Sequence, residues 1–353
     1  MLSLGLGIGT QNLQGEWLEV MFPAPLLSPS EAVTTAVARA LDVTITKTTN
    51  ISVHQEQCPA LASALAALAA LTHDAALKQE VQPLIDLVEA LEDSQRPLVA
   101  TFIVADEAPQ SVPEVYLKLQ LISHRLSRPH SLNLDGMFGV LKNVAWTSEG
   151  AIDIEELPAR QLKARLAGRT LSVDCVDKFP KMTDYVVPTG VRIADTSRVR
   201  LGAYLGEGTT VMHEGFCNFN AGTEGPCMIE GRISAGVFIG AHSDLGGGSS
   251  TMGTLSGGGK QVISVGEKCL IGANAGIGIP LGNRCTVESG LYITAGAKVA
   301  VLDSTGEVAK IVAARELAGQ DDLLFLRHSQ TGRLECRTNK TAVALNKSLH
   351  AHN

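Results

Sequence analysis

Residues 233–247 read ISAGVFIGAHSDLGG, and an aliphatic side chain recurs in them every six positions, at Ile233, Ile239 and Leu245. The same spacing recurs in three further registers, at Ile193, Val199, Leu205, Val211 and Cys217, at Val265, Ile271 and Ile277, and at Leu281, Val287, Ile293 and Val299. Neither the two-residue period of a strand nor the 3.6-residue period of a helix gives this spacing, whereas a hexapeptide repeat does. The sequence therefore predicts a left-handed parallel β-helix.

In such a prism each group of six residues forms one short strand and one corner. The aliphatic residue points inward, and three groups make a coil that stacks on the next at about 4.8 Å. Glycine suits the corners, and 24 of the 35 glycines lie between Gly190 and Gly296. The alternative, a β-sandwich with short strands, predicts alternating residues and turns every 8–12 positions, which this register does not show.

Two segments depart from the repeat. Residues 223–226, TEGP, are expected to interrupt one wall of the prism. Residues 251–260, TMGTLSGGGK, are too polar and glycine-rich for a wall, so we expect them to protrude as a loop. Loops on a rigid scaffold often carry function, although a plain linker between coils is the alternative.

The repeat divides the chain into four predicted parts. Residues 1–110 form an α/β domain, with a helix starting at Ser28–Glu31, helical segments at 60–71 and 81–91, and a buried strand at 97–104. Residues 111–185 form a helical connector that begins with a helix over 112–125, and residues 186–307 form the left-handed β-helix domain. Residues 308–353 form a C-terminal cap, in which 323–327 and 333–337 are expected to pair as a hairpin.

Composition excludes several classes of protein. The net charge is −7 and no run of Lys or Arg occurs, which argues against a nucleic-acid partner. No apolar stretch approaches the roughly 20 residues of a membrane span, and residues 1–17 lack the features of a signal peptide, so we expect a soluble cytoplasmic protein without a membrane partner. The seven cysteines form no CxxC pair, which favours reduced thiols over disulfides or a metal site.

The core of a β-helix is filled with side chains, so its sites must lie outside, between neighbouring prisms. This predicts a homotrimer with three intersubunit grooves. Polar side chains gather in residues 211–222 and 228–234. Glu230 and Arg232 are two positions apart, so in a continuous strand they would face the same side, where an arginine suits an acidic substrate. An ion pair on the surface is the alternative interpretation.

Two other chemistries on related folds find little support. A zinc site with three histidines needs more than the two histidines of the repeat region, His213 and His242. Residues 5–10, GLGIGT, only superficially resemble a nucleotide-binding loop, because they lack the GxGxxG spacing and a following basic residue.

Several long strings make a more specific likeness. They are VRLG at 199–202, TVMHEGF at 210–216, NFNAGT at 218–223, EGRISAG at 230–236, MGTLSGGG at 252–259 and GLY at 290–292. On these strings the chain resembles the longer form of the tetrahydrodipicolinate N-succinyltransferases, strongly over 180–350 and little over the first 110 residues. The resemblance implies transfer of succinyl from succinyl-CoA to the amine of open-chain 2-amino-6-oxopimelate, in lysine and diaminopimelate biosynthesis.

The resemblance also implies roles for individual residues. Glu230 corresponds to the family's catalytic glutamate, acting as a base or carrying the acyl group, and Arg232 contacts the bound ligand. The positions that match the CoA track are Gly247, Ser250, Ala273, Glu288, Ser289 and Gly296. Lys310 and Arg327 are the candidates for the CoA phosphates, and His213 and Asn218 complete the predicted ligand-binding set.

A divalent cation, Mg²⁺, on the trimer axis is a further implication of the family. Glu214 matches one of its ligands, whereas the position of the other, an aspartate in the family, is Ser197 here. Two other functions stay open at this point. One is another CoA-dependent acyltransferase with hexapeptide repeats, and the other is a non-catalytic β-helix scaffold.

Overall fold

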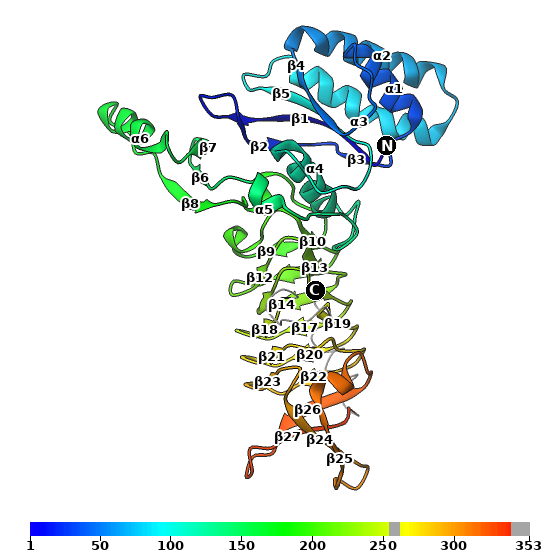
Figure 1. Cartoon of the computed structure of the whole chain (residues 1–353), viewed down its shortest axis with the longest axis vertical. Helices are drawn as coiled ribbons and strands as arrows, with labels where there is room; N and C mark the ends of the chain where they lie inside the picture. The colour runs from blue at the N-terminus through cyan, green and yellow to red at the C-terminus, as the bar shows by residue number, and fades with distance from the viewer. Residues whose placement is uncertain (254–261, 340–353) are drawn as a thin grey trace. The chain divides into compact units, whose positions relative to one another are not determined.

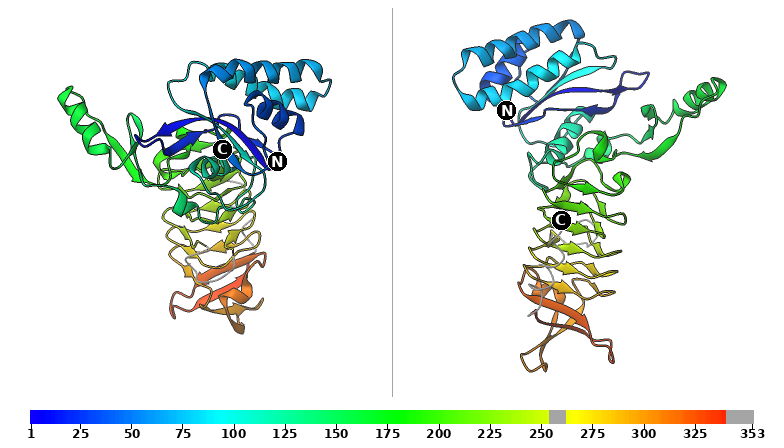
Figure 2. Two further views of the ribbon diagram at one scale, coloured as in Figure 1. Left: turned by 45° about the horizontal axis from the view of Figure 1, so that its top comes forward. Right: turned by 180° about the vertical axis from the view of Figure 1, so that it is seen from behind.

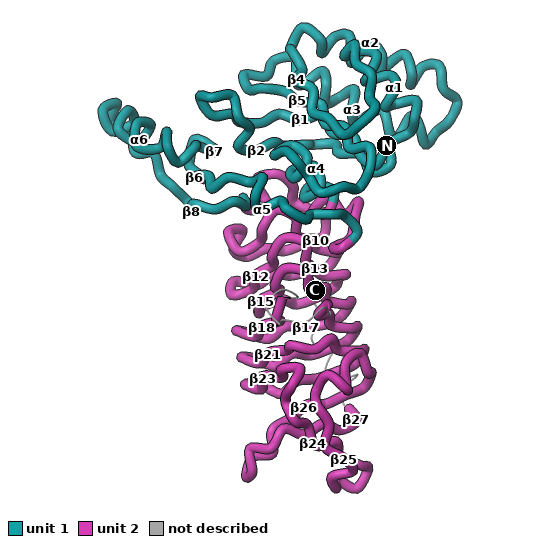
Figure 3. Tube along the Cα trace, in the orientation of Figure 1, with its two compact units in different colours: residues 1–121, 131–180 teal, residues 122–130, 181–353 magenta. Residues whose placement is uncertain are grey.

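The computed structural model describes residues 1–253 and 262–339. The chain forms two compact units (Figure 3). One comprises residues 1–121 and 131–180, and the other comprises residues 122–130 and 181–353.

The first part of unit 1 is a sheet with helices packed on it (Figure 1). Its strands are β1 Ser3–Gln11, β2 Trp17–Met21, β3 Leu26–Leu27, β4 Thr49–Val53 and β5 Leu98–Ile103, in the order β2-β1-β5-β4, with β3 also paired to β1. The helices are α1 Glu31–Ala40, α2 Cys58–Leu71 and α3 Ala75–Leu91, with a 3₁₀ turn at Gln55–Gln57. Apolar side chains of the three helices and of β1 and β5 form one core.

The predicted elements of this part are confirmed. Helix α1 begins directly after Ser30, whose hydroxyl accepts a hydrogen bond from the Val33 amide at 3.3 Å. Every residue of β5 is buried, as the continuous apolar run indicated. Residues 5–10 lie within β1, so they form a strand and no phosphate-binding turn.

The remainder of unit 1 contains a smaller sheet. Helix α4 Val112–Ser123 ends two residues earlier than predicted, and α5 Met137–Val140 follows. The strands β6 Val144–Thr147, β7 Gly150–Asp153 and β8 Val173–Asp177 pair in the order β7-β6-β8, with α6 Leu157–Leu166 between β7 and β8. Only Ile152, Ala164 and Leu171 are fully buried in the cluster beneath α6. None of the described helices is both long and apolar enough to cross a membrane.

Unit 2 is a parallel β-helix with three walls (Figures 1 and 2). Wall A contains β10 Ala203–Leu205, β13 Ala221–Thr223, β16 Phe238–Ile239 and β19 Ser264–Val265. Wall B contains β9 Arg192–Ile193, β11 Thr209–Val211, β14 Cys227–Ile229, β17 Asp244–Leu245, β20 Leu270–Ile271 and β22 Thr286–Val287. Wall C contains β12 Phe216–Cys217, β15 Arg232–Ile233, β18 Ser250–Thr251, β21 Gly276–Ile277 and β23 Tyr292–Ile293. Two 3₁₀ turns, Met182–Asp184 and Thr196–Arg198, precede the regular coils.

The six-residue register is confirmed by burial. The predicted inward residues are almost fully buried from Val199 to Val299, and only Ile193, in the first strand, is partly exposed. Neighbouring strands within each wall are parallel and pair in register, as in Met228 with Asp244 and Ile229 with Leu245. The stacked side chains therefore form a continuous core along the prism.

The predicted interruption at residues 223–226 is wrong. Thr223 and Ile229 are both buried and lie six positions apart, so the repeat passes through this segment unchanged. The register instead breaks between Ile229 and Ile233, both fully buried, which are only four positions apart. The corner between walls B and C in this coil consists of Glu230 and Gly231, and we call these two residues the short corner.

Fourteen positions separate the inward residues Thr251 of wall C and Val265 of wall A, where six is the rule. The segment predicted as a loop, residues 251–260, falls in this interval. Of that segment, residues 254–260 lie outside the described part of the chain.

Residues 122–130 run along the outside of the first coils. The Ser123 hydroxyl donates to the Ala203 carbonyl at 3.0 Å, and Arg125 Nε donates to the Leu205 carbonyl at 2.6 Å. Further along, Arg128 pairs with Glu224 at 2.7 Å, and His130 Nε2 lies 2.7 Å from the Gly236 carbonyl. This segment, which we call the strap, thus contacts three successive coils.

The last coil is followed by β24 Lys298–Leu302, β25 Val308–Ala313, the 3₁₀ turn Ala314–Leu317, β26 Leu323–Arg327 and β27 Leu334–Thr338. Strand β26 continues wall B by pairing in parallel with β22. Strands β26 and β27 are antiparallel neighbours, so the predicted hairpin is confirmed. All seven cysteines are free thiols, and only Cys175 is exposed.

Candidate functional site

The short corner removes two residues from one edge of the prism. In the preceding coil this corner reads Met212-His213-Glu214-Gly215, and in the following coil it reads Gly246-Gly247-Gly248-Ser249. The Met212 amide donates to the Ile229 carbonyl and the Phe216 amide donates to the Gly231 carbonyl, so Glu230 and Gly231 occupy the two ends of the turn. The two middle positions have no counterpart in the coil of Glu230.

The side chain of Glu230 lies against the following coil. Its Cδ and Oε2 atoms are each 3.3 Å from the point where a Cβ on Gly247 would stand. Within the described part of the chain, the Glu230 carboxylate has no hydrogen-bond or ion-pair partner. The amides of Gly247 and Gly248 likewise donate no hydrogen bond to any described residue. A partly buried carboxylate and two free N–H donors therefore meet at this edge.

Small residues continue along the edge from Glu230. Gly246 and Gly272 follow Glu230 in the first position of the corner in successive coils, and Glu288 is next in that row. The second position is occupied by Gly247, Ala273 and Ser289, where the Gly290 amide donates to the Ala273 carbonyl at 2.8 Å. Glu230 and Glu288 are three strand spacings apart, or about 14 Å. Between them the first row presents only glycine.

These glycines are required by close packing. A Cβ on Gly246 would stand 2.8 Å from the Ala273 amide nitrogen, and one on Gly272 would stand 2.5 Å from that of Ser289. Both contacts are with backbone, which cannot move aside easily. The edge is consequently kept free of side chains by the stacking of the coils, and it leaves room for a slender ligand.

Wall C carries the polar side chains beside this edge. Phe216, Arg232, Ser250, Gly276 and Tyr292 are paired in this order in successive strands, so they form one outward column. Arg232 donates from Nε and Nη2 to the Ser250 hydroxyl at 3.2 and 3.1 Å. No carboxylate pairs with Arg232 among the described residues, which leaves its charge available to a ligand.

Glu230 and Arg232 do not share a strand as predicted. Strand β14 ends at Ile229 and β15 begins at Arg232, so Glu230 lies at the corner and Arg232 on wall C. No ion pair joins the two side chains in the described chain. The alternative interpretation of a surface ion pair is therefore not supported either.

His213 and Glu214 form the corner of the preceding coil. Both side chains are exposed, and His213 Nδ1 lies 3.9 Å from Glu214 Oε1. Ser197 donates from its amide and hydroxyl to Asp195 Oδ1 at 3.0 and 2.6 Å. These bonds lower the pKa of the Asp195 carboxyl. The Ser197 hydroxyl is thus engaged in a local turn with Asp195.

The predicted Mg²⁺ finds no support. No three His, Cys, Asp or Glu side chains cluster as metal ligands anywhere in the described residues. A single copy of the chain supplies one carboxylate at the predicted position, Glu214, whereas such a cation needs several oxygen ligands. We therefore propose no step that uses a metal ion.

The other predicted ligand-binding residues are spread along the prism. Asn218 follows β12 and accepts a hydrogen bond from Arg200 Nη1 at 3.2 Å, and the Arg200 guanidinium lies 6.0 Å from the centroid of the Phe216 ring. The Glu288 carboxylate accepts a hydrogen bond from the Arg327 amide at 2.7 Å, which brings Arg327 to the far end of the edge.

Gly296 and Lys310 lie apart from this row. A Cβ on Gly296 would meet nothing within 4 Å, so the turn there is open. Lys310 is exposed on β25, opposite Val301 in the β24–β25 pair. The structure thus places Arg327 beside the corner residues and leaves Lys310 on a separate hairpin.

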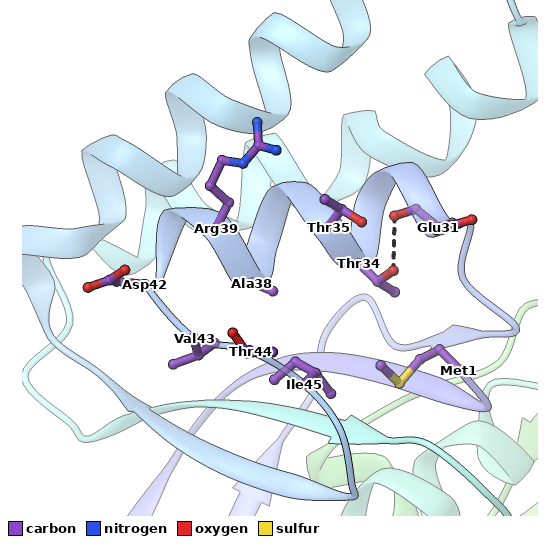
Figure 4. A pocket seen from close by; sticks show the side chains of 10 residues that line it. All are labelled: Met1, Glu31, Thr34, Thr35, Ala38, Arg39, Asp42, Val43, Thr44 and Ile45. Atoms are coloured by element: carbon purple, nitrogen blue, oxygen red, sulfur yellow. Dashed lines mark hydrogen bonds between the residues drawn. The ribbon is translucent and has the colours of Figure 1, made fainter.

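A cavity of about 540 Å³ lies in unit 1, beneath α1 (Figure 4). Thr34 and Ala38 face the segment Val43–Ile45 across it, whereas the Arg39 side chain turns away. Its polar lining residues, among them Glu31, Arg39 and Asp42, lie in unit 1, whereas Glu230 lies in unit 2. We assign it no part in the chemistry.

Two features of the site were missed in the sequence. The step of four positions between Ile229 and Ile233 was visible in the spacing of the aliphatic residues, but it was assigned to the wrong segment. The column from Arg232 to Tyr292 was missed because it depends on which residues of different coils pair. That pairing depends on the number of residues in each coil, which the short corner and the long step after Thr251 change.

Family models match three parts of the chain. Residues 12–139 match the model of the tetrahydrodipicolinate N-succinyltransferase N-terminal domain, and residues 141–181 match that of its middle domain. Residues 262–295 match the hexapeptide repeat of succinyl-transferase.

Full-length relatives carry one name. The chain is 62% identical over 353 residues to the 2,3,4,5-tetrahydropyridine-2,6-dicarboxylate N-succinyltransferase of Pseudomonas paraeruginosa, with 100% of this chain and 99% of the relative covered. The enzyme of the same name from Pseudomonas aeruginosa is 61% identical with the same coverage. That from Vibrio cholerae is 56% identical, with 99% of both chains covered.

A solved structure extends the likeness to three dimensions. A protein from Campylobacter jejuni, named as a 2,3,4,5-tetrahydropyridine-2-carboxylate N-succinyltransferase, superposes with a TM-score of 0.86 at 31% identity, covering 97% of this chain and 93% of its own. Together with the hexapeptide-repeat match, this supports a left-handed β-helix acyltransferase fold. The chain belongs to the tetrahydrodipicolinate N-succinyltransferase family.

Proposed function

We propose that the protein transfers the succinyl group of succinyl-CoA to the amine of open-chain 2-amino-6-oxopimelate, the hydrated form of tetrahydrodipicolinate. This step belongs to lysine and diaminopimelate biosynthesis. The observation that carries the proposal is the short corner, where Glu230 lies against Gly247 at the end of a row of small residues.

The donor fits along the edge between walls B and C. The pantetheine arm of CoA is slender and polar, and the bare row of Gly246 and Gly272 offers it a path with backbone groups on the surface. Ala273, Ser289 and Glu288 continue this path towards Arg327, which can meet the CoA phosphates. This direction brings the thioester to the level of Glu230.

The reaction needs a neutral amine and a polarised thioester. The amine nitrogen attacks the thioester carbon, the C–N bond forms, and the C–S bond breaks to release CoA as a thiol. In one route Glu230 takes the proton of the amine as a general base. In the other, the Glu230 carboxylate first attacks the thioester to give a mixed anhydride, which the amine then opens. Glu230 therefore contacts the attacking amine in the first route and the thioester carbon in the second.

The amides of Gly247 and Gly248 suit the charge that develops on the carbonyl oxygen. They have no protein acceptor in the described chain, and no middle residue of the short corner stands between them and a ligand at Glu230. Fixed N–H donors of this kind stabilise a tetrahedral oxyanion without reorganising during the reaction. The missing residues of the corner thus leave the donors available where the charge appears.

The acceptor carries two carboxylates, and the cations of wall C lie close to the corner. Arg232 has no acidic partner in the described residues, and Arg200 stands two coils away on the same wall. A site on the outside of a prism is open on one side, so a second prism must complete it. For this reason we propose a homotrimer as the working form, with one groove at each of three interfaces.

A thiol-release assay tests the proposal directly. With succinyl-CoA and 2-aminopimelate as the acceptor, the wild-type protein should release CoA continuously. Glu230→Gln should reduce turnover by about 10²- to 10⁴-fold while CoA binding, measured by calorimetry, is retained. Glu267→Gln, a similar change at a corner between walls A and B, is the matched control and should leave turnover unchanged.

The outcomes separate the alternatives. Preference for acetyl-CoA over succinyl-CoA would indicate another acyltransferase, and no binding of CoA would indicate a scaffold. Near-normal turnover by Glu230→Gln would remove Glu230 from the chemistry. A succinyl adduct on Glu230, trapped by mass spectrometry in the absence of an acceptor, would select the anhydride route.

A further inference from the structure

We infer that Tyr292 is a specificity-determining residue, which completes with Arg232 and Ser250 a site for a carboxylate of the substrate. The inference rests on the proposed function, because it assigns a further residue to the same reaction. It starts from the column of wall C, in which Arg232, Ser250, Gly276 and Tyr292 are paired one after another.

The Tyr292 ring lies over the preceding strand. A Cβ on Gly276 would stand 2.1, 2.3 and 2.6 Å from Cε2, Cδ2 and Cζ of Tyr292. Because Cε2 and Cζ are closer than Cγ, the hydroxyl-bearing half of the ring covers Gly276. The side chain thus reaches from its own coil towards Ser250. Only glycine at position 276 allows this placement.

Arg232 reaches the same place from the opposite direction. Its guanidinium donates to the Ser250 hydroxyl, one strand further along the column. Arg232 and Tyr292 therefore extend towards each other over the two strands that separate them. Ser250 and Gly276 lie between them, and neither has a bulky side chain to fill the space.

The polar groups around this space are donors without acid partners. Arg232 forms no ion pair, and the Tyr292 hydroxyl forms no hydrogen bond, in the part of the chain that the structure describes. Tyr292 is 46% exposed, so the hydroxyl is open to a ligand. A guanidinium and a phenol hydroxyl that converge on one space favour a carboxylate over a neutral group.

Both substrates offer such a group near this wall. In the succinyl group two methylenes separate the thioester carbon from a terminal carboxylate. The acceptor carries a carboxylate at each end. The shared chemistry is a carboxylate held beside the short corner, and the source is decided by experiment.

The test uses Tyr292→Phe, which removes only the hydroxyl and keeps the ring over Gly276. A hydrogen bond to a charged group contributes enough for a loss of about 10- to 100-fold in kcat/KM. Gly276→Ala is the second variant, since its methyl group must displace the ring, and it should act in the same direction. Thermal unfolding of both variants shows whether the fold is retained.

Two arms identify the source of the carboxylate. In the donor arm, binding of succinyl-CoA and acetyl-CoA is compared by calorimetry, and a penalty confined to succinyl-CoA assigns the site to the donor. In the acceptor arm, kcat/KM is compared for 2-aminopimelate and 2-aminoheptanoate, which lacks the distal carboxylate. A penalty confined to 2-aminopimelate assigns the site to the acceptor.

The inference and the proposed function fail in different ways. If folded Tyr292→Phe matches the wild type in both arms while the wild type turns over, the inference is overturned and the proposed function stands. An equal penalty for the charged and the uncharged partner in both arms also overturns it, because the hydroxyl then serves the fold. A wild-type protein without succinyl transfer overturns the proposed function and the inference together.

Discussion

The Glu230 carboxylate lies 3.3 Å from the position that a Cβ of Gly247 would occupy, although the two residues belong to different coils. This contact exists because the corner of the first coil is two residues short. Without an intervening turn, a side chain at position 230 can lie directly on the backbone of the next coil.

Gly247→Ala should therefore disturb the site more than the fold. The added methyl group would stand too close to the Glu230 carboxylate, which must move by a few tenths of an ångström to restore a normal van der Waals contact. Misplacement of a catalytic group on that scale or larger lowers turnover. We expect kcat to fall by about 10-fold or more, with little change in the thermal midpoint. Gly139→Ala, where a Cβ meets nothing within 4 Å, is the control for the substitution itself.

Gly231→Ala should instead destabilise the β-helix. Its Cβ would stand 2.0 Å from Ser249 Oγ and 2.7 Å from the Ser249 carbonyl oxygen, so both a side chain and the backbone must shift. Overpacking of this kind costs about 1–3 kcal/mol of unfolding free energy. Urea unfolding measures the loss, and adding Ser249→Gly should recover part of it. Full stability of the single variant would show that the corner is more adaptable than the contact indicates.

Restoring the missing residues tests the role of the short corner. Two glycines inserted between Glu230 and Gly231 return the step from Ile229 to Ile233 to six positions, the length that neighbouring coils accept. We expect a folded protein with turnover reduced by at least about 100-fold, because the new residues separate Glu230 from the Gly247 and Gly248 amides. The same insertion between Leu13 and Gln14, at an exposed turn, is the control. A fully active corner variant would contradict the proposed geometry.

His124 predicts a pH dependence of stability. Its Nε2 atom is buried without a hydrogen-bond partner among the described residues, and burial lowers the pKa of this imidazole. Below about pH 6.5 His124 is protonated in the unfolded chain but stays neutral in the folded chain. Stability is therefore lost as the pH falls from about 6.5 to the folded-state pKa of His124. Above about pH 6.5 the group contributes nothing to this difference.

Denaturant midpoints at pH 7.5 and pH 5.5 measure this contribution. His124→Phe should reduce the difference between the two midpoints relative to the wild type. His130→Phe should not remove this loss, because the His130 ring already has the Gly236 carbonyl as a partner. An unchanged difference in His124→Phe would show that other groups cause the acid sensitivity.

The periodic part of the fold was predictable because one physical rule repeats. Each inward position of the prism must be filled by a side chain of similar size. The spacing of residues such as Ile239, Leu245 and Ile271 therefore indicates the coil length from the sequence alone. The same rule locates the short steps, since Ile229 and Ile233, like Ile277 and Leu281, are both inward and only four positions apart. The hairpin of β26 and β27 followed from its two apolar runs.

The contacts that cross between coils were not predictable in the same way. Whether Tyr292 covers Gly276 depends on a rotamer, and whether Arg232 faces Ser250 depends on how many residues each earlier corner contains. The small sheet of β6, β7 and β8 was not predicted, because residues 111–185 were interpreted only as a helical connector. Its core of Ile152, Ala164 and Leu171 is too small to leave a clear period.

The strap has a consequence for the order in which the prism comes apart. A stack of coils with nearest-neighbour contacts tends to fray from its ends, one layer at a time. Here Arg125, Arg128 and His130 join the first three coils to a segment about ninety positions away in the chain. We therefore expect the coil that carries Glu230 to open cooperatively with the two before it, and hydrogen exchange to begin at the opposite end of the stack.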